Sequence, residues 1–152
     1  MKTVLLVEDE ENDVFLMERA FRKAAADANV QVARDGREAL RYLRGEARYS
    51  NRDEHPMPSL ILLDLNLPYV PGLEVLRNIR QNPKLQKLVV VVLTSSLADA
   101  DIEQAYQLGA NSYISKPHGL EELQDTVELL ARYWLHENRP ANSLVGEHAA
   151  LH

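Results

Sequence analysis

The stretch LILLDLNLP, residues 60–68, runs four aliphatic residues into a single acid, Asp64. Asn66 and Pro68 then interrupt the strand pattern. A short aliphatic run bounded by turn residues is typical of a strand buried on both faces, as in a parallel sheet. A carboxylate directly after such a strand lies at the edge where open α/β sheets bind their ligands.

Other runs along the chain share the aliphatic and β-branched character of this strand, namely TVLLV (3–7), VQVA (30–33), LVVVVL (88–93) and SYIS (112–115). Segments with helical spacing follow each of them, and Gly109 is expected to stop the fourth helix. Parallel neighbours need crossover helices, so this alternation predicts a three-layer, doubly wound α/β fold with a parallel sheet covered on both faces.

The last amphipathic segment is the longest. Its apolar residues recur at three- and four-residue spacing, which predicts a helix to about residue 137: Leu120, Leu123, Val127, Leu130 and Trp134. We therefore expect one domain over residues 1–137 and a C-terminal extension over 138–152. Residues 44–59 are polar and proline-rich, which predicts an exposed loop.

Composition excludes several classes of protein. The chain has 152 residues, 45% hydrophobic and 26% charged, as expected for one globular domain. It has no cysteine, so disulfides and thiolate metal sites are excluded and a cytoplasmic location is expected. A net charge of -6 argues against nucleic acid as a partner. The apolar runs are too short for a signal peptide or a membrane span.

Polar residues follow the predicted strands. Glu8 and Asp9 follow the first, Asp64 the third, Thr94 the fourth and Lys116 the fifth. Each alone is more often a turn residue, a helix cap or a solvated charge, but the set should meet at one edge of the sheet. Crowded carboxylates bind hard cations, which predicts Mg²⁺ on the three acids. Asp64 could then act as a nucleophile toward a phosphoryl group, with Thr94 and Lys116 stabilising its oxygens.

These residues resemble the pattern of the response-regulator receiver domain, the CheY-like module of two-component signalling, over about residues 3–135. The resemblance implies a flavodoxin-like sheet in the order 2-1-3-4-5. It also implies that Asp64 accepts a phosphoryl group from a histidine kinase with Mg²⁺, and that the pair Lys116 and Pro117 follows the fifth strand.

The resemblance assigns further roles. It implies that the Asn66 backbone carbonyl ligates the metal, that Ser95 leaves access to the phosphoryl group, and that Asn66 and Ser96 tune its lifetime. Thr94 and Tyr113 should move together on phosphorylation and change the surface of the fourth helix, fifth strand and fifth helix. The sequence YVPG (69–72) departs from the family, in which an Asp often precedes the glycine.

The C-terminal sequence ARYWLHENRP (131–140) resembles single-domain receivers associated with bacterial phytochromes. This implies a bacteriophytochrome as the kinase and a homodimer. The candidate dimer contacts are apolar residues near the helix end, Leu130, Tyr133, Trp134 and Leu135, with Leu144 and Val145 beyond them. The sequence leaves no room for a DNA-binding or enzymatic output domain, and it names no downstream target.

Other functions fit the residues less well. Phosphatases that use an aspartyl phosphate need a second acid two residues after the nucleophile, where this chain has Asn66. A flavin-binding fold needs a phosphate-binding loop after the first strand, where this chain has acids. The alternative that stays open is a degenerate receiver that binds its partners without phosphorylation. The only chemistry expected is self-catalysed transfer to Asp64 and slow autodephosphorylation.

Overall fold

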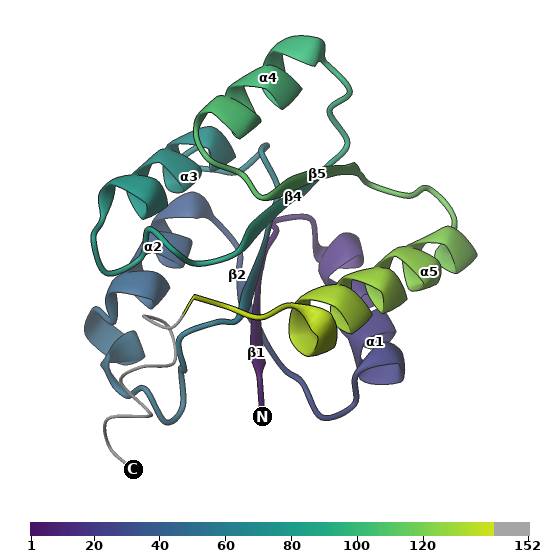
Figure 1. Ribbon diagram of the computed structural model, residues 1–152, viewed down its shortest axis with the longest axis horizontal. Coiled ribbons are helices and arrows are strands. Elements are labelled where there is room, and N and C mark those ends of the chain that lie inside the picture. The colour runs from purple at the N-terminus through teal and green to yellow at the C-terminus, as the bar shows by residue number, and fades with distance from the viewer. Residues whose placement is uncertain (142–152) are drawn as a thin grey trace.

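The computed structural model describes residues 1–141, and these form a parallel sheet with helices on both faces (Figure 1). The predicted contacts Leu144 and Val145 lie outside this range. The strand order is β2-β1-β3-β4-β5, which confirms the predicted fold. The strands are β1 (Thr3–Val7), β2 (Asn29–Ala33), β3 (Leu60–Leu63), β4 (Val90–Thr94) and β5 (Ser112–Ser115).

Two hydrophobic cores lie on opposite faces of the sheet because alternate strand residues point to opposite sides. Leu5 and Ile61 pack on one side with α2, α3 and α4, whereas Val4 and Leu60 pack on the other with α1 and α5. Figure 1 shows this division. The helices are α1 (Glu11–Ala24), α2 (Gly36–Arg44), α3 (Gly72–Gln81), α4 (Asp99–Gln107) and α5 (Leu120–Leu130).

The register of the strands brings the predicted functional residues together. Val7 of β1 pairs with Leu63 of β3, so the next residue on each strand, Glu8 and Asp64, lie side by side. On the other side of β3, Thr94 ends β4 opposite Ser115 of β5, and Lys116 follows.

Local signals explain where the helices begin and end. The Glu10 side chain caps α1 by accepting hydrogen bonds from the backbone N–H groups of Asn12, at 3.2 Å, and Asp13, at 2.9 Å. Gly109 adopts a φ of 99° just after α4, which confirms its predicted role as a helix stop.

The expectation of an exposed loop over residues 44–59 is wrong for part of the segment. Residues Ala47–Ser50 form a short 3₁₀ helix, η1, and Tyr49 is only 4% exposed. Arg52 donates hydrogen bonds to the carbonyl groups of Tyr42 and Leu43 at 2.7 and 2.8 Å. The segment is ordered because it covers the C-terminal end of α2 and satisfies carbonyl groups there.

The C-terminal helix ends where it was predicted to end, at Glu137, and its last part, Ala131–Glu137, is a π-helix, η2. The predicted dimer contacts in this helix need correction. Leu130 and Leu135 are buried in the core of their own domain, at 5% and 2% exposure, so they are not surface contacts for a dimer. Tyr133 is exposed, whereas Trp134 is partly buried against the core.

Leu120 also departs from the predicted apolar stripe, because it is 65% exposed at the first position of α5. Within residues 1–141, no helix is both long and apolar enough to cross a membrane.

Candidate functional site

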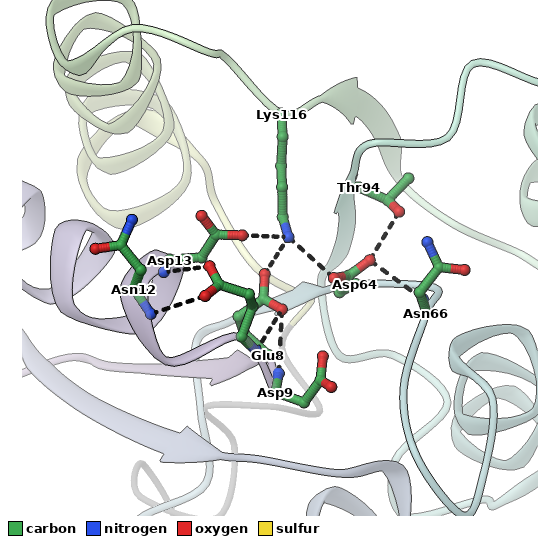
Figure 2. Close-up of polar contacts among 9 residues, drawn as sticks. Glu8, Asp9, Asn12, Asp13, Asp64, Asn66, Thr94 and Lys116 are labelled. Atoms are coloured by element: carbon green, nitrogen blue, oxygen red, sulfur yellow. Dashed lines mark hydrogen bonds and ion pairs between the residues drawn. The ribbon is translucent and has the colours of Figure 1, made fainter.

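The carboxylate of Asp64 lies at the end of β3 with a hydrogen-bond donor on each oxygen (Figure 2). Thr94 Oγ1 donates to Oδ1 at 2.7 Å, and the Asn66 backbone N–H donates to the same oxygen at 3.2 Å. Lys116 Nζ donates to Oδ2 at 3.0 Å. Asp64 is only 5% exposed and Thr94 is fully buried, so these contacts are shielded from bulk water.

Glu8 is the second buried acid of the site, at 2% exposure. Its Oε2 accepts hydrogen bonds from the backbone N–H groups of Asp9 and Glu10 at 3.1 and 3.3 Å, and its other oxygen pairs with Lys116. Burial, together with the adjacent Asp64, raises the pKa of Glu8 to about 7.

Asp64 and Lys116 are shifted toward their charged forms. Burial raises the pKa of Asp64, but the Thr94 hydroxyl and the Lys116 ammonium outweigh burial and hold it below its usual range. Burial lowers the pKa of Lys116, but contacts with Glu8, Asp13 and Asp64 raise it overall. At neutral pH Asp64 is therefore an ionised carboxylate held beside a cation, which is the form that a nucleophilic carboxylate needs.

Three carboxylates of the site fit a hard divalent cation. Ligand oxygens of Glu8, Asp9 and Asp64 all lie within 4.8 Å of one another. Asp9 is exposed, so its side chain is open to a cation arriving from solvent. Mg²⁺ prefers carboxylate oxygens and keeps several waters, and a cation here would offset charge that the single ammonium of Lys116 does not balance.

Asp13 is the site residue that the sequence prediction missed. Its Oδ2 accepts a hydrogen bond from Lys116 Nζ at 2.9 Å across 103 positions of the chain. The acidic run VEDEEND (7–13) was a weak signal, because most of its acids are exposed. The path of α1 after its cap at Glu10 brings Asp13 to the lysine (Figure 2).

The residues predicted to follow β4 lie beside the site in different ways. Ser95 is exposed and lines a cavity next to Asp64. The Ser96 hydroxyl donates a hydrogen bond to the Asp101 carboxylate near the start of α4, at 2.5 Å. This hydrogen bond directs the Ser96 hydroxyl to α4 rather than to Asp64. Tyr113 donates its hydroxyl to the Ser96 carbonyl at 3.0 Å, which ties β5 to the segment after Thr94.

The cavity next to Asp64 has a volume of about 280 Å³. Asp64, Asp13 and Lys116 line its polar side, and Leu16 and Leu123 are among its apolar lining residues. It therefore presents both apolar side chains and the Asp64 carboxylate to a molecule that enters it.

Comparison with known proteins identifies this arrangement. The family model of the response regulator receiver domain matches residues 4–128. The chain is 40% identical over 134 residues to response regulator Rcp1 of Synechocystis sp., covering 88% of this chain and 89% of that protein. It is 41% identical over 136 residues to the probable methanogenesis regulatory protein FilR2 of Methanothrix harundinacea, covering 90% and 85%.

Solved structures of response regulators have the same fold as this chain. The phosphorylated cyanobacterial phytochrome response regulator RcpA matches with a TM-score of 0.86 and 40% identity, over 91% of this chain and 97% of that one. The Mn²⁺-bound form of Rcp1 matches with a TM-score of 0.83 and 37% identity, over 93% and 99%. The chain belongs to the response regulator receiver domain family, whose general function is phosphorylation-based signalling in two-component systems.

Proposed function

We propose that this protein is a single-domain response regulator whose Asp64 accepts a phosphoryl group from a histidine kinase. The observation that carries the proposal is the environment of the Asp64 carboxylate. This carboxylate is buried and ionised, and two further acids, Glu8 and Asp9, lie next to it. One of its oxygens accepts a hydrogen bond from the Thr94 hydroxyl, and the other accepts one from the Lys116 ammonium. An acid that served only as a helix cap or a turn residue would not need this set of neighbours.

This geometry supports a direct transfer of the phosphoryl group from the kinase histidine to Asp64. An oxygen of Asp64 forms a bond to phosphorus while the bond from phosphorus to the kinase histidine nitrogen breaks, and the electron pair of that bond stays with the imidazole. Thr94 and Lys116 are positioned to donate to the oxygens of the incoming group. Glu8, Asp9 and Asp64 would hold Mg²⁺, with the Asn66 carbonyl as a further ligand, and the ion would neutralise phosphoryl charge.

The phosphoryl group would signal by shifting a population between two states of the domain. Thr94 would leave its present contact with Asp64 to bind a phosphoryl oxygen, and the β4–α4 segment would follow it. Tyr113 is attached to that segment through the Ser96 carbonyl. A change at Thr94 would in this way reach the surface formed by α4, β5 and α5.

Hydrolysis would return the domain to its first state. A water oxygen attacks phosphorus, the bond to Asp64 breaks, and the products are the carboxylate and inorganic phosphate. We infer that Asn66, which is exposed beside the acceptor, influences the approach of this water. The hydroxyl of Ser96 would act only after release from Asp101, whereas exposed Ser95 leaves the cavity open.

We infer that the kinase partner is a bacteriophytochrome and that the regulator forms a homodimer. The relative RcpA supports the first inference, since it is a phytochrome response regulator, but FilR2 is equally similar in sequence. For the dimer, Tyr133 is the exposed candidate on η2, and its ring lies 4.8 Å from that of Trp134. A cytoplasmic location stays a prediction.

Labelling with phosphoramidate in the presence of Mg²⁺ tests the function. We expect the wild-type chain to take up one phosphoryl group and Asp64→Asn to take up none, because the amide is not a nucleophile. Asp99→Asn changes an exposed acid on α4 and is the matched control. Labelling that persists in Asp64→Asn would place the acceptor elsewhere, and an unlabelled wild type would favour the degenerate receiver.

Light scattering on a sizing column tests the dimer. We expect Tyr133→Ala to shift the protein toward the monomer without changing phosphoramidate labelling, because Tyr133 is exposed on η2, away from Asp64. An unchanged mass would exclude this residue from the interface.

A further inference from the structure

The Lys116 ammonium contacts three carboxylates at once (Figure 2). It pairs with Glu8, with Asp13 Oδ2 at 2.9 Å and with Asp64 Oδ2 at 3.0 Å. A lysine ammonium has three N–H donors, so each carboxylate can take one of them. The lysine side chain is only 17% exposed, and its position is set by these three partners.

Phosphoryl transfer would give two of these partners, Glu8 and Asp64, new contacts in addition to Lys116. Glu8 and Asp64 belong to the cluster whose oxygens lie within 4.8 Å of one another and fit a divalent cation. Asp64 also becomes the acceptor. Asp13 lies outside that cluster, so it is the one partner of the three that neither a cation bound there nor a phosphoryl group on Asp64 would engage.

The backbone of Asp13 is held firmly enough to act as an anchor. Its N–H donates to the capping side chain of Glu10 at 2.9 Å, and the next residue, Val14, is buried in the core together with Met17. The lysine, by contrast, has a flexible four-carbon stem. If Glu8 and Asp64 turned to a cation and a phosphoryl group, a lysine without Asp13 would lose its fixed position.

We propose that Asp13 is a positioning residue that keeps the Lys116 ammonium at the acceptor while Glu8 and Asp64 exchange partners. This inference rests on the proposed function of Asp64 and deepens it. Asp13 does not touch the reacting atoms. It acts through Lys116, whose charge must lie beside the phosphoryl oxygens when negative charge develops there.

The first experiment compares initial rates of phosphoramidate labelling at saturating Mg²⁺. We expect Asp13→Ala to lower the rate by about tenfold, the lower end of what loss of an orienting partner costs. Glu11→Ala removes the same charge from the same turn of α1, where the side chain is exposed, and should label at the wild-type rate. Equal rates for Asp13→Ala and Glu11→Ala would overturn the inference while leaving the function of Asp64 intact.

A double-mutant cycle with Lys116→Ala separates positioning from general structural damage. Its observable is the affinity for beryllofluoride, a phosphoryl mimic, at saturating Mg²⁺. We expect Asp13→Ala to weaken this affinity in the wild-type background and to have no further effect when Lys116 is absent. The same loss in both backgrounds would mean that Asp13 supports only the fold of α1, and the proposal would be wrong.

The cycle also distinguishes this proposal from the function on which it rests. If the wild-type chain neither labels nor binds the mimic, the proposed role of Asp64 fails. If the wild type does both and Asp13→Ala does so equally well, only the role of Asp13 fails.

Discussion

Gly72 lies directly against the backbone that presents the acceptor. A Cβ at this position would be 2.3 Å from the carbonyl oxygen of Asp64 and 2.6 Å from Cα of Leu65. The Gly72 N–H also donates to the Leu65 carbonyl at 3.0 Å. The start of α3 therefore packs against the acceptor segment at a distance that only glycine permits, and the position of Asp64 depends on it.

Gly72→Ala should consequently destabilise the protein, by about 3 kcal/mol, because the methyl group meets backbone atoms that cannot rotate away. Urea unfolding measures this cost. Gly119→Ala is the matched control, since its Cβ would meet only the flexible end of the Glu122 side chain and its φ of -98° suits any residue. Equal stability of the two variants would contradict the argument from close packing.

The helix α2 and the short helix η1 are joined through Glu38. Its Oε1 accepts hydrogen bonds from the Tyr49 hydroxyl at 2.5 Å and from Arg48 at 2.6 Å, and its Oε2 accepts from the Arg34 backbone N–H at 3.3 Å. Burial raises the pKa of Glu38, but these donors outweigh burial and lower it overall. The Glu38 carboxylate thus helps to hold in place a segment that was expected to be an exposed loop, together with the Arg52 hydrogen bonds at the end of α2.

The contribution of Glu38 to stability should depend on pH. Because its pKa is lower in the folded state, the stabilisation is present above its ordinary pKa of 4.5 and is lost as the pH falls through the lowered value. Glu38→Gln should cost about 1 kcal/mol at pH 7 and less at pH 3, measured by urea unfolding. Glu46→Gln, an exposed acid 3.8 Å from Arg44, should show little effect at either pH.

The domain as a unit is a scaffold that brings strand ends to one edge. Alternate strand residues are buried on the two sides of the sheet, and the register of β1 with β3 places Glu8 beside Asp64. The consequence is that acids are buried next to one another: burial, together with the adjacent Asp64, raises the pKa of Glu8 to about 7. A ligand that offsets the charge of these acids should stabilise the folded state.

Thermal unfolding tests this coupling between ligand and fold. Mg²⁺ binds the assembled site and not the unfolded chain, so millimolar Mg²⁺ should raise the unfolding midpoint, and beryllofluoride should raise it further. Saturation at about 100 times the dissociation constant is worth about 2.7 kcal/mol, which corresponds to several degrees. Asp64→Asn should lose the second rise. No response to either ligand would mean that the acids do not form a metal site.

The sequence by itself determined the fold class and most of the site. Short aliphatic runs alternating with helical periodicity specify a parallel sheet, because such strands must be buried on both faces. The polar residues after four of the strands then mark the edge where ligands bind, and so Glu8, Asp64, Thr94 and Lys116 could be named from the sequence. These signals are local, since each is read within a few residues.

Only the tertiary structure decided which side chains meet between elements distant in sequence. The contact of Asp13 with Lys116 depends on the path of α1 after its cap. Leu130 and Leu135 look like surface contacts in sequence, but the packing of α5 and η2 buries them. Tyr49 likewise is buried because its ring packs in the core against Tyr42 while its hydroxyl bonds Glu38 of α2. Whether a side chain is buried or paired with a charge depends on the residues around it in space. The local sequence does not specify those residues.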